Sequence, residues 1–134
     1  MQQEKILSLL QASALPFSDI LWENTHFWTA HRGAEMLGCI GLEKYGNKGL
    51  LRSFAVEPGS RNKGIGGKLL QQLLEAAPGL ELQEIYLLTT TAEAYFSQKG
   101  FSPINRADTP DAIKLTSEFS SVCPSSAVVM YKYC

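Results

Sequence analysis

The sequence has few of the features that mark secreted, metal-binding or membrane-spanning proteins. Its three cysteines, Cys39, Cys123 and Cys134, are odd in number, widely spaced and not grouped with histidines. This spacing argues against a disulfide framework and against a zinc site, so we expect no bound metal. No basic start leads into an apolar run of signal-peptide length, and no apolar segment is long enough to cross a membrane. We therefore expect a cytoplasmic protein without a membrane partner.

The sequence also has no marked excess of either basic or acidic residues. The 134 residues include 12 basic and 13 acidic side chains, which give a formal net charge of -1. A chain so balanced has no general attraction for nucleic acid or anionic lipid, and any anion-binding site must be local. With 45% hydrophobic and 19% charged residues, the composition is that of a globular protein, and the length suits a single domain over residues 1–134.

Hydrophobic periodicity predicts an α/β fold with one mixed, mostly antiparallel sheet flanked by helices. Turn residues separate the first three strands, so these strands should form an antiparallel meander. The strand at 84–88 follows a helix and should therefore pair in parallel with the strand at 50–56, as a right-handed crossover unit. The expected helices cover residues 2–12, 64–77, 91–99 and 111–119, and the expected strands cover residues 27–31, 36–44, 50–56, 84–88 and 127–133.

The second of these helices begins in a basic, glycine-rich turn with the sequence R-N-K-G-I-G-G-K at 61–68. Two familiar phosphate-binding motifs do not fit this turn. A Walker A loop would need lysine where Ile65 stands, and a dinucleotide fingerprint would need a third glycine where Leu69 stands. Gly64 and Gly66 nevertheless let a pyrophosphate approach backbone amides at a helix start, where the helix dipole and the basic side chains favour an anion. The turn therefore predicts a phosphate site.

The pattern Arg-x-x-Gly-x-Gly at 61–66, after a strand that ends in A-V-x-P at 55–58, resembles the acetyl-CoA motif of the GNAT N-acetyltransferases. The resemblance implies the GNAT fold and acetyl-CoA as co-substrate. It also implies that the pantetheine arm lies beside the strand at 50–56 and bonds its backbone. The residues that the resemblance assigns to cofactor binding are Phe54, Ala55, Val56, Arg61, Asn62, Lys63, Gly64, Ile65, Gly66, Gly67, Lys68 and Thr89.

Further segments narrow the resemblance within this family. The run L-T-T at 88–90 and the aromatic-x-x-x-Gly-Phe helix end at 96–101 are similar to amino-acid N-acetyltransferases, including the acetyl domain of N-acetylglutamate synthases. Segments 41–46, 51–53 and 119–127 are similar to small GNATs associated with arsenic-resistance operons. These similarities imply acetylation of the amino group of a small amino acid or an amino-acid analogue, which could contain arsenic. Family members often form homodimers, so the resemblance also allows a homodimer.

Two alternatives stay open beside this function. One is a module that binds acetyl-CoA without turnover, and the other is a protein or peptide N-acetyltransferase. Phe96 keeps the first alternative open, because it stands where many GNATs carry a tyrosine that acts as general acid toward the leaving thiolate. The neighbouring Tyr95 should point elsewhere, because adjacent residues of a helix face different directions. Tyr45 or Tyr131 could supply the acid instead.

Amine acetylation also needs a base, and two neighbouring strands carry the candidate side chains. Glu43 is the candidate base, and Tyr45, on the same face of its strand, completes the predicted catalytic pair. Strand alternation predicts that Arg52 shares a face with Phe54 and Val56. Arg52 lies in an apolar strand and needs a carboxylate, which either Glu43 or an amino-acid substrate supplies.

Hydroxyl side chains are expected close to the acceptor. The residues predicted to bind the substrate are Arg52, Ser53 and Thr90. Thr90 or Thr91 should also cap the helix that follows, because a threonine hydroxyl readily accepts a hydrogen bond from a helix N-terminal amide.

Overall fold

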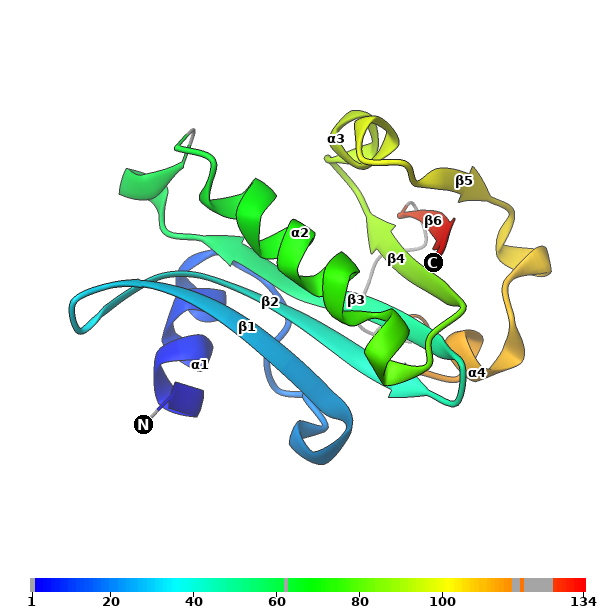
Figure 1. The fold of residues 1–134 in the computed structure, drawn as a ribbon, viewed down its shortest axis with the longest axis horizontal. Coiled ribbons are helices and arrows are strands. Elements are labelled where there is room, and N and C mark those ends of the chain that lie inside the picture. The colour runs from blue at the N-terminus through cyan, green and yellow to red at the C-terminus, as the bar shows by residue number, and fades with distance from the viewer. Residues whose placement is uncertain (1, 62, 117–118, 120–126) are drawn as a thin grey trace.

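A six-stranded mixed sheet forms the centre of the fold (Figure 1). The computed structural model describes residues 2–61, 63–116, 119 and 127–134. Its longer elements follow the chain in the order α1 (Gln2–Ala12), β1 (Thr25–Arg32), β2 (Glu35–Tyr45), β3 (Lys48–Val56), α2 (Ile65–Ala76), β4 (Glu84–Thr89), α3 (Glu93–Gln98), β5 (Ser102–Ile104), α4 (Asp111–Lys114) and β6 (Val128–Tyr133). Short 3-10 helices lie at Trp22–Asn24, Pro58–Ser60, Pro78–Leu80 and Arg106–Asp108.

The strands of the sheet lie in the order β1-β2-β3-β4-β6-β5. β1, β2 and β3 form the expected antiparallel meander, β3 pairs with β4 in parallel, and β6 runs antiparallel to both β4 and β5. The predicted α/β fold, with a mixed, mostly antiparallel sheet and one parallel unit, is therefore confirmed. β5 was not expected, because its three residues include a proline and are too few to show alternation.

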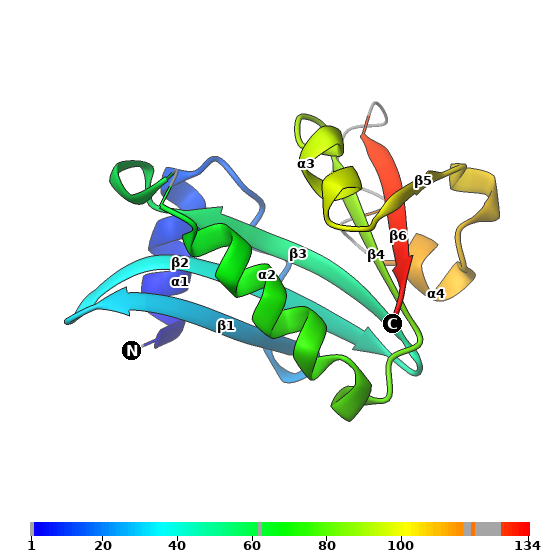
Figure 2. The same ribbon diagram turned by 45° about the horizontal axis from the view of Figure 1, so that its top comes forward.

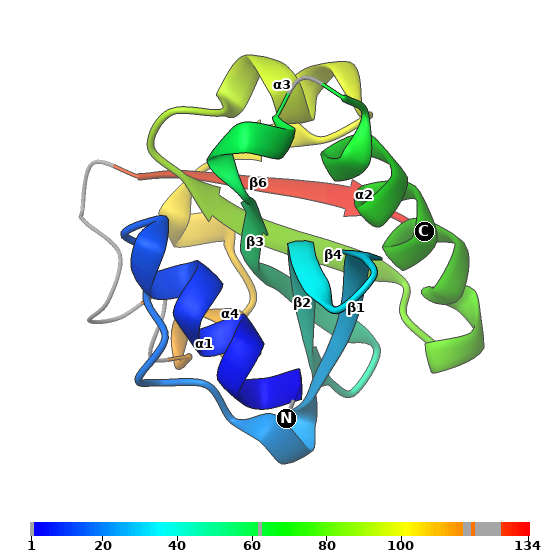
Figure 3. The same ribbon diagram turned by 90° about the vertical axis from the view of Figure 1, so that its left-hand side faces the viewer.

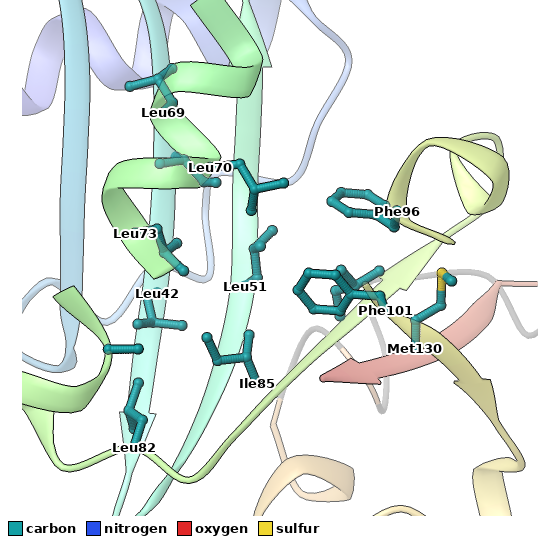
Figure 4. Close-up of a cluster of buried hydrophobic side chains, with 13 residues drawn as sticks. Leu42, Leu51, Leu69, Leu70, Leu73, Leu82, Ile85, Phe96, Phe101 and Met130 are labelled. Carbon is teal, nitrogen blue, oxygen red and sulfur yellow. The ribbon is translucent and has the colours of Figure 1, made fainter. Parts of the chain in front are cut away.

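Helices α1 and α2 cover opposite faces of the meander (Figure 3). On α2, Leu69, Leu70 and Leu73 recur at helical spacing and are buried. They pack over Leu42 of β2 and Leu51 of β3 in the main hydrophobic cluster (Figure 4). Each buried leucine contributes about 1.5–3 kcal/mol relative to an exposed one, so this packing fixes α2 and the turn before it on the sheet.

β3 and β4 pair over only the first part of each strand. Their register runs from Lys48 opposite Glu84 to Leu50 opposite Tyr86. Beyond that point the two strands diverge, as Figure 2 shows. The divergence opens the sheet at the carboxyl ends of the parallel pair, where ligands collect in units of this kind.

β3 also contains a β-bulge at Ser53. Cys39 of β2 lies opposite Ala55, whereas Gly41 lies opposite Arg52, so two residues of β3 stand against one residue of β2. The backbone of Ser53 has a φ of 56°, in the left-handed region that residues other than glycine rarely adopt. The regular alternation of side chains between the two faces of the sheet is interrupted at this residue.

Because of the bulge, the prediction that the side chains of β3 alternate regularly between the two faces of the sheet is wrong. Arg52 lies on the α1 side of the sheet and bonds Asp19, in the connection that follows α1. Phe54 and Val56 lie on the α2 side, next to Gly66. A regular strand would have placed all three β3 side chains on one face.

The later helices are shorter than predicted. α3 begins at Glu93 instead of residue 91, and α4 ends at Lys114, while residues 117 and 118 of the helix predicted over 111–119 lie outside the described residues. Within the ranges that the structure describes, no helix has both the length and the apolar character of a membrane span.

Candidate functional site

Two neighbouring cavities, which share lining residues, lie where β3 and β4 diverge. The inner cavity has a volume of about 640 Å³ and the glycine-turn cavity one of about 570 Å³, and both are lined by Leu15, Phe54, Ala92 and Tyr95. The other described residues that line the inner cavity are Ala14, Pro16, Leu51, Arg52, Ser53, Leu87, Leu88, Thr89, Thr90, Thr91, Phe96 and Ala127. Those that line the glycine-turn cavity are Ser13, Ala55, Val56, Ser60, Arg61, Gly64, Ile65, Gly66 and Gly67.

Short hydrogen bonds hold the turn between β3 and α2. The Glu57 carboxylate accepts from the Gly59 amide at 2.8 Å and from the Ser60 hydroxyl at 2.9 Å. These two bonds hold the pKa of Glu57 below its ordinary value, and the bond from Ser60 has the larger effect. Arg61 Nε donates to the carbonyl of Val56 at 3.1 Å, which ties the turn to the end of β3. The turn is therefore shaped by its own contacts.

The first amides of α2 open onto the glycine-turn cavity. Gly64, at the N-cap, has a φ of 79° and no side chain to accept from these amides. A Cβ on Gly66 would lie 3.4 Å from the Phe54 ring and 3.6 Å from Val56, so a longer side chain would project into space that the cavity uses. The first-turn amides, which no side chain of the described residues caps, and the helix dipole make this end of α2 suitable for a phosphate or pyrophosphate.

Most of the predicted cofactor residues line one of the two cavities. Thr89 lines the inner cavity, and the other described residues of the set line the glycine-turn cavity, except Lys63 and Lys68. Both lysines are exposed beside the turn. Asn62 lies outside the described residues.

Two residues that line this site carry a buried hydroxyl group without a hydrogen-bond partner among the described residues. The hydroxyl groups are Ser13 Oγ, at the end of α1, and Tyr95 Oη, on α3. Burial raises the pKa of Tyr95, so its hydroxyl keeps its proton and can donate. A buried hydroxyl without a partner costs free energy, and a ligand with polar atoms in the cavity would remove that cost. The residues present therefore fit a cofactor with amide and carbonyl groups, such as pantetheine.

The expectation that Tyr95 points away from the site is wrong. Tyr95 lines both cavities, and its ring lies 6.3 Å from that of Phe54. Phe96 is only 6% exposed and packs against Phe101, with ring centroids 5.6 Å apart, while it also lines the inner cavity. Neighbouring residues of a helix differ in direction by only about 100°, so Tyr95 and Phe96 can both line one broad cavity.

Arg52 lies at the centre of a buried ionic network. Its two terminal nitrogens bond the two carboxylate oxygens of Asp19, each at 2.7 Å, and its Nη1 also lies 3.4 Å from Glu43 Oε2. Its Nε donates to Ser53 Oγ at 3.0 Å. Of the two partners left open for Arg52, the structure therefore shows Glu43, and it adds Asp19, which the sequence did not indicate. Two carboxylates of the protein thus hold the guanidinium.

Glu43 is part of this network and Tyr45 bonds to it, and neither residue is in the lining of the two cavities. Glu43 is 2% exposed, and its Oε1 accepts a hydrogen bond from the Tyr45 hydroxyl at 3.2 Å. Burial raises the pKa of Glu43, while Arg52 and then the Tyr45 hydrogen bond oppose the increase. The shared face of Glu43 and Tyr45 is as predicted, but their catalytic roles stay predictions.

Three consecutive threonines lie at the end of β4 and directly after it. Thr89 Oγ1 accepts a hydrogen bond from the Ala92 amide at 2.9 Å, which turns the chain into α3. The prediction that Thr90 or Thr91 caps α3 is wrong, because the N-cap residue of this helix is Ala92, which has no capping side chain. Thr90 and Thr91 instead line the inner cavity, together with Ser53.

A family model for the acetyltransferase (GNAT) domain matches residues 23–103. The chain is 33% identical over 82 residues to an amino-acid acetyltransferase of Mycobacterium tuberculosis, and 32% identical over 83 residues to one of Pseudomonas aeruginosa. These matches cover 58% and 60% of this chain but 47% and 19% of those proteins. The chain therefore spans less than half the length of these two curated relatives.

Solved structures share the fold over nearly the whole chain. A Mycobacterium tuberculosis protein in complex with CoA matches 99% of this chain and 94% of its own, with a TM-score of 0.82 and 24% identity. N-acetylglutamate synthase from Neisseria gonorrhoeae, complexed with coenzyme A and N-acetylglutamate, matches 98% of this chain and 32% of its own, with a TM-score of 0.79 and 16% identity. At such identities the likeness shows the fold alone.

Proposed function

The chain belongs to the family of GNAT acetyltransferase domains, and from this premise we propose that it is an acetyl-CoA-dependent N-acetyltransferase. In the proposal its acceptor is the amino group of a small amino acid or an amino-acid analogue. The two sequence relatives named amino-acid acetyltransferase support this acceptor class. An amine that contains arsenic is one such analogue.

The observation that carries the proposal is that the two cavities share part of their lining. The N-terminus of α2, which has no capping side chain among the described residues, bounds the glycine-turn cavity, and four residues line both this cavity and the inner one. A cofactor with a pyrophosphate at one end and a reactive group at the other suits the first cavity. A small molecule that meets the reactive group suits the second.

The cofactor supplies an acetyl group that its thioester already activates. In the proposal the amides of Ile65 to Gly67 hold the pyrophosphate, with Arg61, Lys63 and Lys68 adding positive potential. The backbone of Phe54, Ala55 and Val56 lies along the pantetheine. Tyr95 and Ser13 donate hydrogen bonds to polar atoms in the same cavity. Thr89 bounds the acetyl end.

On the acceptor side, polar side chains of the inner cavity position the amine. We assign this role to Ser53 and Thr90, which line the cavity. Arg52 contributes a wall of the cavity, and its charge is balanced by Asp19 and Glu43, so the contacts favour a structural role over direct binding of a substrate carboxylate. In the proposal the amine attacks the thioester carbonyl directly, and the carbon–nitrogen bond forms as the carbon–sulfur bond breaks with a thiolate as the leaving group. The amine gives its proton to water in the cavity. Glu43, with its raised pKa and its Tyr45 contact, is the base at the end of that path.

Thiol release from acetyl-CoA tests the proposal. The protein is incubated with acetyl-CoA and, one at a time, with the common amino acids, their amides, an arsenic-containing amino acid and a peptide with a free N-terminus. We expect thiol release that depends on a small amino acid or analogue, and a mass increase of that acceptor by one acetyl group. Failure to bind acetyl-CoA by calorimetry would refute the proposal.

A second candidate, a module that binds acetyl-CoA without turnover, is favoured by Phe96 and Glu43. Phe96 carries no proton to donate, and Glu43 does not line the described part of either cavity. This candidate predicts saturable acetyl-CoA binding with no thiol release for any acceptor. Release with the peptide alone would favour a peptide N-acetyltransferase.

Sedimentation of the same sample tests the homodimer that the family resemblance allows.

A further inference from the structure

We infer that Asp19 is a positioning residue for the acceptor: through its salt bridge with Arg52 it holds the end of the connection in which Pro16 forms part of the wall of the inner cavity. The inference rests on the proposed acetyl transfer. It assigns a role on the acceptor side to a residue that lines neither cavity in the described structure.

The salt bridge is short, bidentate and almost closed to solvent. Asp19 Oδ1 and Oδ2 each lie 2.7 Å from a terminal nitrogen of Arg52, and the two side chains are 10% and 1% exposed. A carboxylate paired with a guanidinium in this way is fixed in both position and orientation. Arg52 is in turn held to the sheet by Ser53 and Glu43. Asp19 is therefore attached to the centre of the sheet.

The segment between α1 and Asp19 forms a wall of both cavities. Ala14, Leu15 and Pro16 line the inner cavity, and Ser13 and Leu15 line the glycine-turn cavity. The connection that contains them lies on the α1 side of the sheet (Figure 3). A shift of this segment would change the shape of the space that the acceptor occupies.

The two ends of this segment are anchored differently. At the first end, the amide of Ser13 donates to the Leu9 carbonyl and the amide of Leu15 to the Leu10 carbonyl, each at 3.0 Å, so the last turn of α1 holds them. Pro16 follows and has no amide hydrogen to donate. At the second end, the side chain of Asp19 makes the attachment to the sheet.

This difference predicts which cavity responds to the loss of the salt bridge. Ser13 and Leu15, which bound the glycine-turn cavity, keep their backbone bonds to α1 when Asp19 is changed. Pro16 bounds only the inner cavity and lies on the side of the segment that Asp19 holds. Binding of the acceptor should therefore weaken more than binding of acetyl-CoA.

The test compares Asp19→Asn with Asp19→Glu and with Glu35→Gln as a matched control. Asp19→Asn keeps the shape of the side chain and removes its charge, whereas Asp19→Glu keeps a carboxylate. Glu35 forms an ion pair with Arg32 that is largely exposed, with side chains 54% and 69% accessible. The acceptor is the amino acid with the highest kcat/KM in the thiol-release panel. For each variant, we measure the KM of that amino acid, the Kd of acetyl-CoA by calorimetry, and urea unfolding.

We expect Asp19→Asn to raise the acceptor KM about tenfold, because a displaced wall misplaces the bound amine. The Kd of acetyl-CoA should change by less than about twofold, since its cavity keeps the α1 anchors. Asp19→Glu should recover part of the loss, and Glu35→Gln should leave all three quantities unchanged. Arg52→Lys keeps the charge without the planar fork and should raise the acceptor KM by a smaller factor, so it replaces Asp19→Asn if that variant does not fold.

A loss of stability in Asp19→Asn with an unchanged acceptor KM would overturn the inference, because the salt bridge would then be structural only. An equal loss of acceptor and acetyl-CoA affinity would also overturn it, because the whole site would have changed. Wild-type protein that binds acetyl-CoA but acetylates no acceptor would instead refute the proposed function, and the inference with it. The wild-type activity thus separates the two failures.

Discussion

Replacing Arg52 with methionine should be one of the most damaging single changes to this fold. The Arg52 side chain is 1% exposed and balances Asp19 and Glu43, whose side chains are 10% and 2% exposed. Methionine fills similar space but removes the cation that both carboxylates contact. Breaking a buried pair by removing one partner costs about 3–5 kcal/mol. A domain of this kind has a total stability of roughly 5–15 kcal/mol, so the variant should lose a large share of it.

The loss should also depend on pH. The positive charge of Arg52 is the largest of the influences that lower the pKa of Glu43. Without Arg52 this pKa, already raised by burial, should rise further. A carboxyl whose folded pKa exceeds its unfolded pKa stabilises the fold below the unfolded value, and that contribution is lost as pH rises through the folded pKa. The deficit of Arg52→Met should therefore be larger at pH 8 than at pH 5.

Urea unfolding followed by circular dichroism at both pH values measures this deficit, and the midpoint of thermal unfolding should fall by about 10–15 °C at pH 8. Arg32→Met is the control, because Arg32 and its partner Glu35 are 69% and 54% exposed and such pairs contribute about 0.2–1 kcal/mol. A deficit below about 1 kcal/mol, or one equal at both pH values, would show that the buried network is not held together as described.

Three further changes test the site. Glu43→Gln removes a carboxyl with a raised pKa, so the stability of this variant should fall less than that of the wild type as pH rises from 5 to 8 in urea unfolding. Tyr95→Phe removes a buried hydroxyl that has no partner among the described residues, so the ligand-free protein should gain up to about 1 kcal/mol, while calorimetry shows weaker acetyl-CoA binding. A gain in both quantities would contradict the role given to that hydroxyl. Gly64→Ala places a side chain at a φ of 79°, which should cost about 1–2 kcal/mol in thermal unfolding and weaken acetyl-CoA binding, whereas an unchanged midpoint would argue against the left-handed N-cap.

The parts of the structure that the sequence predicted are those that depend on local pattern. α2 and its turn were predictable because leucines recur at helical spacing, Gly64 and Gly66 open the helix, and Pro78 follows its end. The parallel pairing of β3 with β4 followed from the helix between them. Neither inference needed to know which residues meet across the sheet.

The bulge in β3 gave no such local signal. Left-handed backbone is usually marked by glycine or asparagine, and here it falls on Ser53, in the middle of an apolar run. Reading the strand as regular therefore placed Arg52 on the same face as Phe54. Asp19 was missed for a related reason, because it lies 33 residues from Arg52 in a connection without periodicity. Only the fold brings the two side chains together.

The bulge also explains how one strand can serve two purposes. Before Ser53, the side chain of Arg52 turns toward α1 and fastens the connection that bounds the acceptor side. After Ser53, Phe54 turns toward α2 and closes the wall shared with Tyr95. A charged residue in an apolar strand must first be neutralised by the protein, because an unpaired buried charge is costly before any substrate arrives. Arg52 meets that demand through Asp19 and Glu43, and its effect on an acceptor is therefore transmitted through the position of the wall.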